Sequence, residues 1–328
     1  MLISINKHYA IAIFIIFLYF SIPTFAESNY ITVTGGGKIY YEERGKGEPL
    51  IFLHGHSLDC TMWDKQFKYF SNHYHAIRID FRGYGQSSKQ IEGFQFCHAD
   101  DVITLMDSLG IHRAHIVGLS MGGFVAGDLL AMYPSRLLSC TLASGSIRST
   151  PGPSTPIDEK EYSKRLQDIT ALKASGIEEM KSKWINTLVS SHPHTRKPLT
   201  RMVNKWDAWQ SLHCEQRLYY ATDAWEMLKI RKPSIPVLIL RGEEENKGTK
   251  TKESQWLSDV TLITLLSCGH MMNLHNPKLF NQTLHNWLIK DERFRRGPFI
   301  KSFPSGEDLG EASKNLPPLI INLLYKFP

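Results

Sequence analysis

Short apolar runs alternate with amphipathic stretches along most of this chain, and no other feature of the sequence constrains the fold as strongly. Several of the apolar runs are continuous and rich in leucine or β-branched residues, which is expected of strands buried on both faces. Strands that alternate with amphipathic helices indicate an α/β fold, with a mostly parallel central sheet flanked by helices. The eight candidate strands are residues 31–34, 38–43, 50–54, 76–80, 115–118, 139–143, 237–241 and 262–266.

Three helices are expected between or after these strands. In residues 100–110, apolar side chains recur three and four positions apart, which gives one apolar helical face, and a glycine closes the pattern. A second helix is expected to begin just after Ser120 and to end before residue 133. A third is expected from residue 277 to about residue 289.

One long stretch interrupts the alternation. Residues 147–232 contain no convincing strand, and residues 159–172 and 176–189 have helical patterns. We therefore expect a helical cap, inserted between two strands, that covers one end of the sheet. Its aromatic side chains are candidates for a substrate site, but a stripe of large apolar residues is as often the core of the insertion itself. Four of the seven tryptophans lie in this stretch: Trp184, Trp206, Trp209 and Trp225.

The first 26 residues have the layout of a secretory signal peptide. Lys7 precedes an apolar run of 12 residues (9–20), and Pro23 and a small residue, Ala26, mark a predicted cleavage site after residue 26. A run of 12 falls short of the roughly 20 apolar residues that span a membrane. We expect export to the periplasm or the exterior, with an uncleaved membrane anchor as the alternative.

The remaining chain divides into three predicted parts. Residues 27–146 and 233–290 form the α/β core, residues 147–232 form the cap, and residues 291–328 form a C-terminal extension of unknown role. Charged residues make 21% of the chain and hydrophobic ones 42%, which is typical of a globular protein. The net charge of +6 is not gathered in a basic stripe, so no nucleic-acid partner is expected.

The five cysteines are interpreted in the light of the expected export. An odd number leaves at least one thiol unpaired, and Cys140, which lies in an apolar run, is expected to be a small buried hydrophobic residue. The spacing of the other four leaves their disulfide pairing open. No two cysteines form a CxxC pair, so no zinc site is expected.

The segment 118–122 reads GLSMG and has the GxSxG pattern of a nucleophile on a tight turn. It follows a predicted strand and opens a predicted helix, and the small residues at its two ends allow the backbone to turn sharply. Ser120 would then be raised into solvent above the end of the sheet.

Four separated motifs have the order and spacing of one known family. They are HGHS at residues 54–57, DFRGYGQS at 80–87, GLSMG at 118–122 and CGH at 268–270. On these motifs the sequence resembles the α/β-hydrolase superfamily, in the branch of serine esterase-like and lipase-like enzymes with a helical cap. The resemblance covers residues 31–289.

The resemblance implies a set of catalytic residues. Ser120 would be the nucleophile, and His270 would act first as a base toward Ser120 and then as an acid toward the leaving alcohol. The backbone N–H groups of His56 and Met121 would form the oxyanion hole. His54 is expected to hold the loop that carries His56.

Other polar residues near the motifs are expected to have structural roles. Asp80 and Arg82 would hold the turn of the second motif. His275 and His285, in or beside the last predicted helix, are expected to be packing or surface residues.

The acid that orients the histidine is where the sequence departs from the family. Most members place an aspartate three residues after the glycine that ends the next-to-last strand, and Glu245 stands at that place here. Its neighbours Glu243 and Glu244 remain alternatives, because the extra methylene of glutamate requires a different turn, and an acid elsewhere in the chain remains a further alternative. No acid follows the strand 139–143, where some members carry theirs.

The sequence therefore predicts an exported serine hydrolase that needs no metal or cofactor and cleaves small to medium apolar esters with a Ser-His-Glu triad. Serine at position 120 excludes the dehalogenases and epoxide hydrolases of the superfamily, which need aspartate there. Perhydrolase, carbon–carbon hydrolase and iminopeptidase activities remain alternatives, as does a non-catalytic ligand-binding protein on the same fold. A membrane would be a partner only if the N-terminal segment stays uncleaved, and the oligomeric state is left open.

Overall fold

The computed structural model describes residues 27–89, 96–147, 159–212, 224–245 and 255–296. The chain forms two compact units, residues 1–284 and 285–328, and the sheet, the cap and the candidate site all lie in the first unit. The predicted signal peptide and residues 297–328 of the predicted extension lie outside the described residues. Among the residues that are described, no helix combines the length and the apolar character needed to cross a membrane.

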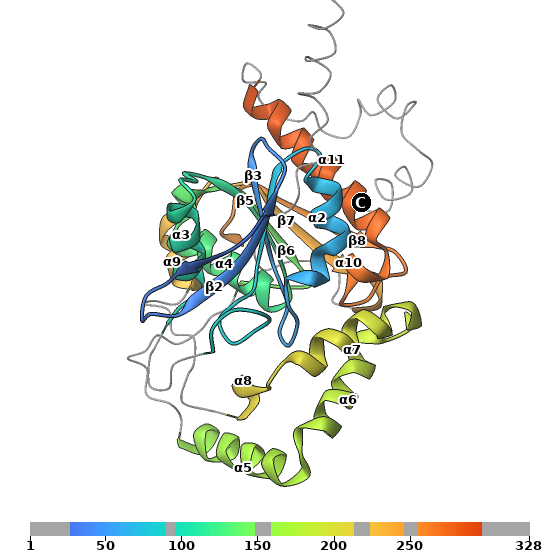
Figure 1. Cartoon of the computed structure of the whole chain (residues 1–328). Coiled ribbons are helices and arrows are strands. Elements are labelled where there is room, and N and C mark those ends of the chain that lie inside the picture. Colours follow the sequence, from blue (N-terminus) through green and yellow to red (C-terminus); the bar gives the residue numbers. More distant parts are fainter. Residues whose placement is uncertain (1–26, 90–95, 148–158, 213–223, 246–254, 297–328) are drawn as a thin grey trace, which may run out of the picture. The chain divides into compact units, whose positions relative to one another are not determined.

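An eight-stranded sheet forms the centre of the first unit, with the strand order β1-β2-β4-β3-β5-β6-β7-β8 (Figure 1). The strands from β4 to β8 in this order run parallel, and β2 is antiparallel to both of its neighbours. The predicted α/β fold with a mostly parallel sheet is confirmed. The strands are β1 (Glu27–Thr32), β2 (Lys38–Arg44), β3 (Pro49–Leu53), β4 (His75–Ile79), β5 (Ala114–Leu119), β6 (Leu137–Ala143), β7 (Val237–Gly242) and β8 (Val260–Leu265).

Helices cover both faces of the sheet, which explains why the central strands are continuous apolar runs. In Figure 1, α3, α4 and α9 lie on one side of the sheet, and α2 and α10 lie on the other. All six residues of β5 are buried, as are ten of the twelve residues of α4. The helices of the core are α2 (Asp64–Phe70), α3 (His98–Ser108), α4 (Met121–Met132), α9 (Ala224–Arg231), α10 (Met272–His275) and α11 (Pro277–Arg296), with 3-10 turns η1 (Cys60–Trp63), η2 (Pro134–Arg136) and η4 (Glu243–Glu245).

The strand order places a topological switch point at the carboxyl ends of β3 and β5. The chain passes from β3 to β4 on one side and then crosses to β5 on the other side of β3. In open α/β sheets, ligands bind where successive connections diverge in this way. Leu53 of β3 pairs with Gly118 of β5, so the loops that follow these two strands begin side by side.

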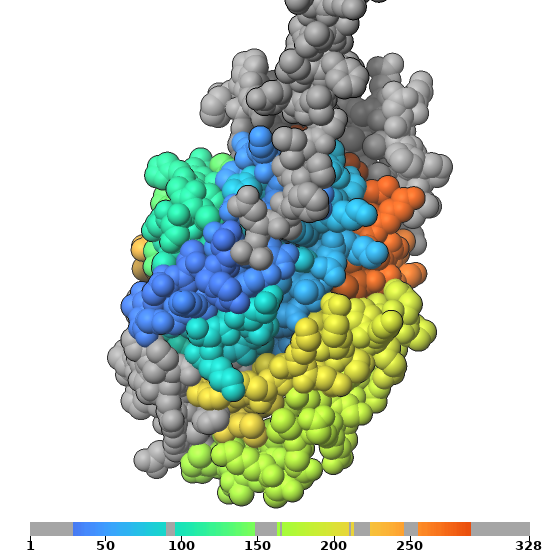
Figure 2. Space-filling view, in the orientation of Figure 1, coloured from blue at the N-terminus to red at the C-terminus, as the bar shows by residue number. Residues whose placement is uncertain are grey.

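Four helices form the described part of the cap, which is inserted in the sequence between β6 and β7. As the sequence predicts, no strand occurs among the described residues of this stretch. In Figure 2 the green and yellow surface of the cap lies directly against the blue and cyan surface of the N-terminal part of the core. The cap elements are α5 (Glu159–Ser175), α6 (Ile177–Val189), η3 (Pro193–Thr195), α7 (Arg196–Lys205) and α8 (Trp209–Leu212).

The helix α9 lies within the range predicted as cap but packs with the core. The Arg231 guanidinium donates hydrogen bonds to the carbonyl oxygens of Ala131 and Met132 at the end of α4, at 2.8 and 2.7 Å. Ala224 and Leu228, one turn apart on α9, are buried in the core. Periodicity did not separate this helix from the cap, because a short helix has the same pattern whether it covers a sheet or a substrate site.

The four described cysteines are buried free thiols. The prediction for Cys140 is confirmed, because its side chain is fully buried and burial raises the pKa of its thiol well above the ordinary value. Cys214 lies outside the described residues. The four thiols are those of Cys60, Cys97, Cys140 and Cys268.

A buried ion pair holds the turn after β4. Arg82 donates two hydrogen bonds to the carboxylate of Asp101 in α3, at 2.7 Å each, and another to the carbonyl oxygen of Thr34. The side chains of the pair are 2% and 3% exposed. Asp80, at the start of the same turn, accepts a hydrogen bond of 2.6 Å from the Cys60 N–H. Asp80 and Arg82 therefore hold this turn, as the sequence predicts.

Removal of the Asp101 charge is expected to destabilise the fold strongly. Asp101→Asn keeps the shape of the side chain but removes the carboxylate charge that faces the buried Arg82 guanidinium, and breaking a buried pair in this way costs about 3–5 kcal/mol. Urea unfolding followed by circular dichroism measures the loss. In the exposed control pair, Glu179 and Lys183 of α6, Glu179→Gln is expected to leave the unfolding midpoint unchanged. A wild-type midpoint for Asp101→Asn would contradict the prediction.

Candidate active site

Ser120 lies on a strained turn between β5 and α4, with φ of 56° and ψ of −115°. A serine is uncommon in this left-handed region of φ, and such strain persists only where the surrounding structure enforces it. The Ser120 N–H donates to the carbonyl oxygen of Ala143 at the end of β6, at 2.8 Å. The turn is therefore tied to the carboxyl edge of the sheet on its β6 side.

The glycines of segment 118–122 make this turn possible by allowing backbone to pack on backbone. A Cβ atom on Gly118 would lie 2.0 Å from the carbonyl oxygen of Gly122. A Cβ atom on Gly122 would lie 2.1 Å from the carbonyl oxygen of Leu53 in β3. Both approaches are too short for any side chain, so the GxSxG pattern is a packing requirement of this turn.

Two backbone N–H groups near Ser120 correspond to the predicted oxyanion hole. Met121 is the first residue of α4, so its N–H has no acceptor within the helix. His56 follows Gly55 in a turn closed by the Leu58 N–H on the Gly55 carbonyl, so the His56 N–H is not used by the turn itself. A Cβ atom on Gly55 would lie 3.5 Å from Ser120 Cβ, which places this turn in contact with the serine.

The loops after β7 and β8 bring Glu245 and His270 together. His270 Nδ1 lies 2.9 Å from Glu245 Oε1, and the side chain of Glu245 is only 6% exposed. An acid at this distance holds the imidazole proton on Nδ1 and leaves Nε2 as the acceptor. Gly242 of β7 pairs with Leu265 of β8, so the two loops begin at adjoining strand ends.

The other two glutamates of this segment have different partners. Glu243 accepts a hydrogen bond of 2.9 Å from the Ser267 N–H, and Glu244 accepts one of 2.8 Å from the hydroxyl of Ser191 in the cap. Within the described part of the chain, Glu245 is the member of the three that is bonded to the histidine. The structure thus places at the imidazole the glutamate that the three-residue spacing favours.

Ser144 completes the surroundings of this carboxylate, and sequence reasoning missed it. Its Oγ lies 2.8 Å from Glu245 Oε2 and 3.0 Å from the carbonyl oxygen of His270. The Gly242 N–H also reaches Oε2, at 3.2 Å. Ser144 is the first residue after β6, the strand end at which some members of the family carry their acid, and that position is the signal that could have identified it.

Two histidines in the loop after β3, the buried His54 and the half-buried His56, are neutral. His54 donates from Nδ1 to the carbonyl oxygen of Gly55 at 2.8 Å and accepts at Nε2 from the Phe81 N–H at 2.9 Å. His56 Nδ1 lies 2.8 Å from the hydroxyl oxygen of Tyr84. Burial lowers the pKa of each imidazole to about 4. Both ring nitrogens of His54 are engaged, so this residue holds the loop that carries His56, as the sequence predicts.

A third neutral histidine supports the loop that carries His270. His275 accepts a hydrogen bond of 3.0 Å at Nδ1 from the Gly269 N–H, and its ring stacks on His192 of the cap with the centroids 3.7 Å apart. Burial, together with the neighbouring His192, lowers the pKa of His275 to about 4. His275 is thus a packing residue, one of the two roles expected for it, and His285 lies in the second unit.

A cavity of about 700 Å³ is bounded by the cap and by His56. Trp184 and Trp206 line it, so two of the four cap tryptophans contribute to a cavity as well as to packing. Trp225 donates its indole N–H to the Ile147 carbonyl at 3.0 Å and packs against the core. The other lining residues are Leu172, Ser175, Glu179, Met180, Lys183, Thr187 and Ser211.

No three His, Cys, Asp or Glu side chains converge as metal ligands would anywhere in the described part of the chain. The titratable groups around the site are bonded to one another, as in the pair Glu245 and His270, or to the backbone, as in His54 and His275. The groups that the site supplies are a serine hydroxyl, an imidazole and a carboxylate.

Comparison with known families assigns the chain to one of them. The sequence model described as alpha/beta hydrolase fold matches residues 48–277, well over half of the chain. The chain therefore belongs to the alpha/beta hydrolase family of enzymes. All four motifs, from residue 54 to residue 270, lie within the match.

Individual relatives agree with this assignment. The chain is 25% identical over 276 residues to (E)-2-((N-methylformamido)methylene)succinate hydrolase of Acinetobacter baylyi, which covers 80% of this chain and 98% of the relative. It is 24% identical over 270 residues to an uncharacterised carboxylesterase of Bacillus subtilis, with 79% and 86% covered. A thermophilic esterase from Thermogutta terrifontis has a similar fold, with a TM-score of 0.66, 23% identity, and 81% of this chain and 99% of that chain covered.

The buried His275 predicts a specific dependence of stability on pH. Its pKa is about 4 in the folded protein, against an ordinary value of 6.5. Between these values the unfolded chain binds a proton that the folded protein does not, so His275 lowers the unfolding free energy as the pH falls from 6.5 to 4. His275→Asn keeps an acceptor for the Gly269 N–H but does not titrate. Urea unfolding measures the unfolding free energy at each pH across this range. The slope of this free energy against pH is expected to be smaller in His275→Asn than in the wild type, by up to about 1.4 kcal/mol per pH unit.

The test compares the slope of unfolding free energy against pH between variant and wild type, because other groups titrate in the same pH range. Burial raises the pKa of Asp80 to about 6, so Asp80 contributes to the unfolding free energy with the opposite sign. His112, whose side chain is exposed, is the control position, and His112→Asn is expected to keep the wild-type slope. An unchanged slope in His275→Asn would refute the prediction.

Proposed function

We propose that this protein is an exported serine hydrolase that cleaves small to medium apolar carboxylic esters through an acyl-enzyme on Ser120. The observation that carries the proposal is the hydrogen bond between Glu245 and His270, which follow β7 and β8 at the same carboxyl edge of the sheet as the Ser120 turn after β5. Because the carboxylate holds Nδ1, the free Nε2 of His270 is the group that would take the serine proton.

In the first half of the proposed reaction, Ser120 Oγ attacks the ester carbonyl carbon while its proton passes to His270 Nε2. A bond forms between Oγ and the carbon, and the carbonyl oxygen becomes an oxyanion. The intermediate collapses when the bond to the leaving alcohol breaks, and His270 gives its proton to that alcohol. In the second half, water repeats these steps on the acyl-enzyme and releases the carboxylic acid and free Ser120.

Fixed groups would stabilise the charges that develop along this path. The N–H groups of His56 and Met121 would donate to the oxyanion, and losing one such donor typically costs about 3 kcal/mol of transition-state stabilisation. Glu245 would stabilise the imidazolium of His270. Its other oxygen is within hydrogen-bond distance of Ser144, so the carboxylate is already oriented before the charge forms.

The cavity beside His56 supports an apolar substrate class. Its lining combines leucine, methionine and two tryptophan side chains with the charges of Glu179 and Lys183, which pair with each other at 2.7 Å. The pKa of His56 is lowered to about 4 by burial, so its imidazole adds no charge at neutral pH. The names of the carboxylesterase and the thermophilic esterase among the relatives also fit an ester substrate.

The glutamate in place of the usual aspartate is the sequence feature that favours a non-catalytic binding protein. In the structure the longer side chain of Glu245 reaches His270 at an ordinary hydrogen-bond distance. The departure therefore lends no support to the binding function, and we propose hydrolysis over it.

The proposed triad predicts how Ser120 reacts with a fluorophosphonate probe. We expect stoichiometric labelling of Ser120 in the wild type, none in Ser120→Ala, and labelling slowed by roughly 10³-fold or more in His270→Ala, because the serine is then no longer activated. Mass spectrometry measures the labelling. Hydrolysis of p-nitrophenyl butyrate, followed by absorbance, is expected to fall in the same variants.

The glutamate segment supplies a matched pair of variants for this test. Glu245→Gln is expected to lower kcat/KM by roughly 10³- to 10⁴-fold, because an amide favours the wrong tautomer of the histidine. Glu243→Gln is expected to leave kcat/KM unchanged, because Glu243 is bonded to the Ser267 backbone. Hydrolysis that persists in Ser120→Ala, or equal losses in the two glutamine variants, would sink the proposal.

The N-terminal segment supports export. Its short apolar run and the small residues before position 27 are typical of a cleaved signal peptide. Mass spectrometry of the protein recovered from the periplasm or medium of an expressing bacterium is expected to find a chain that begins at Glu27. A chain that keeps residues 1–26 and stays in the membrane fraction would replace export with anchoring.

A further inference from the structure

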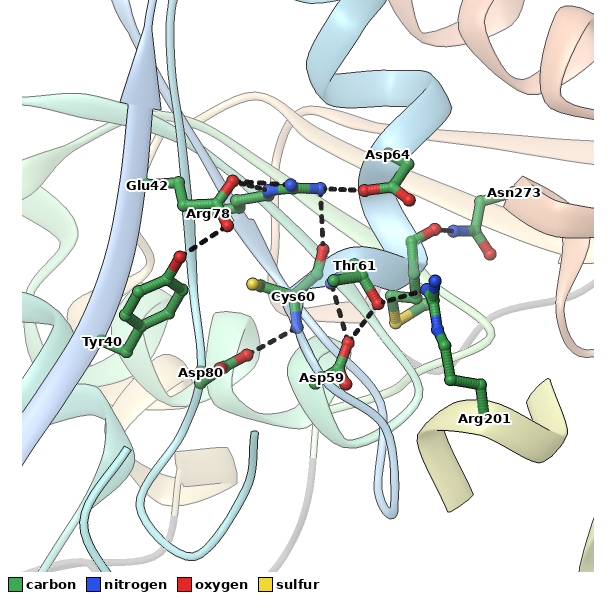
Figure 3. Close-up of polar contacts among 11 residues, drawn as sticks. Tyr40, Glu42, Asp59, Cys60, Thr61, Asp64, Arg78, Asp80, Arg201 and Asn273 are labelled. Atoms are coloured by element: carbon green, nitrogen blue, oxygen red, sulfur yellow. Dashed lines mark hydrogen bonds and ion pairs between the residues drawn. The ribbon is translucent and has the colours of Figure 1, made fainter. Parts of the chain in front are cut away.

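The segment after β3, residues 55–63, is tied to the core through its second half. The Cys60 N–H donates to Asp80 at 2.6 Å, and the Asn273 side chain donates to the carbonyl oxygen of Met62 at 3.0 Å. Figure 3 shows these contacts around η1. They fix the backbone from residue 60 onward, whereas His56 lies in the first half of the segment.

In the first half, Ser57 connects the backbone of His56 to the cap. Ser57 is fully buried and has a left-handed φ of 64°. Its Oγ lies 2.5 Å from the carbonyl oxygen of His56 and accepts a hydrogen bond of 2.7 Å from the indole N–H of Trp184 in α6. A hydroxyl that accepts a hydrogen bond donates more strongly, so the contact from Trp184 strengthens the bond between the Ser57 hydroxyl and the His56 carbonyl oxygen.

A second cap tryptophan contacts the side chain of the same residue. The ring of Trp206 meets the imidazole of His56 edge to face, with the centroids 4.7 Å apart, while His56 Nδ1 is bonded to Tyr84. Trp184, Trp206 and His56 line the same cavity. The residue that carries the proposed oxyanion donor is therefore held by the cap as well as by the core.

We propose that Trp184 is a positioning residue for the oxyanion hole: its indole N–H, acting through the Ser57 hydroxyl, orients the backbone at His56 so that the His56 N–H faces the oxyanion. The inference rests on the proposed ester hydrolysis and adds that the cap helps to set the reaction rate as well as the choice of substrate. Because the oxyanion exists only along the reaction path, loss of this orientation lowers kcat and leaves KM unchanged.

Arg201 in α7 serves as a matched control, because it also joins the cap to segment 55–63 but has no connection to the backbone of His56. Its guanidinium donates to the Thr61 hydroxyl at 2.9 Å, and the Thr61 N–H donates to Asp59 at 2.9 Å (Figure 3). This contact also joins the cap to segment 55–63, but at the half that the core already holds. Arg201→Met therefore tests whether any cap contact affects the rate.

The experiment measures kcat and KM for p-nitrophenyl butyrate, and the affinity for a trifluoromethyl ketone that forms an oxyanion on the serine. Trp184→Phe keeps an aromatic ring and removes the N–H, and kcat is expected to fall about 3- to 10-fold with KM unchanged. The affinity for the ketone is expected to fall by the same factor. Arg201→Met is expected to keep wild-type values of all three.

Ser57→Gly removes the hydroxyl that links the Trp184 N–H to the His56 carbonyl oxygen. Glycine adopts the left-handed φ of this position without strain. It is expected to lose as much kcat as Trp184→Phe, and the double variant is expected to lose no more than either single one. Ser57→Gly keeps the inference testable if Trp184→Phe fails to fold, which thermal unfolding reports.

The possible outcomes separate this inference from the proposed function. An active wild type with unchanged kcat in Trp184→Phe and Ser57→Gly overturns the positioning role alone. A change confined to KM, or an equal loss of kcat in Arg201→Met, overturns it as well. A wild type that neither hydrolyses the ester nor reacts with the fluorophosphonate overturns the proposed function, and this inference with it.

Discussion

The approach of the first turn of α4 to the end of β3 is the constraint on which the rest of the site depends. Gly122 packs against the carbonyl oxygen of Leu53 so closely that no side chain fits between them. This backbone contact leaves Ser120 on a strained turn and sets the loop that carries His56 against it. The distance between the proposed nucleophile and the proposed oxyanion donors is thus decided by the packing of the sheet and helix backbones.

Buried neutral histidines hold the loops around this contact. A neutral imidazole can donate at one nitrogen and accept at the other, as His54 does between Gly55 and Phe81. A charged imidazolium has two donors and could not accept the Phe81 N–H. Burial lowers the pKa of these histidines to about 4, so they keep this dual role at neutral pH. Because these histidines are neutral, none of them adds a positive charge that would compete with His270 for the Glu245 carboxylate.

Most of the fold could be predicted from local patterns, because burial on both faces makes the central strands continuous apolar runs. Seven of the strands and the helices α3, α4 and α11 appear where the sequence predicts them, whereas β1 begins four residues before the predicted range 31–34 and ends at Thr32. The assignment of α9 to the core could not be predicted, since a short helix does not reveal which surface it covers. Ser144 was missed for a related reason: its contact with Glu245 joins residues 101 positions apart, and a lone serine after a strand has no distinctive pattern.

The class of the protein follows from local sequence, through the glycines that permit the turn at Ser120 and the order of four motifs along the chain. Local sequence also favoured three adjacent glutamates as the source of the acid. The tertiary structure decided which of them meets His270, because the extra methylene of glutamate leaves the direction of the side chain to the turn after β7. It alone decided that the indole of Trp184 reaches Ser57, since that contact depends on how the cap docks on the core, and docking is a property of surfaces that are far apart in the chain.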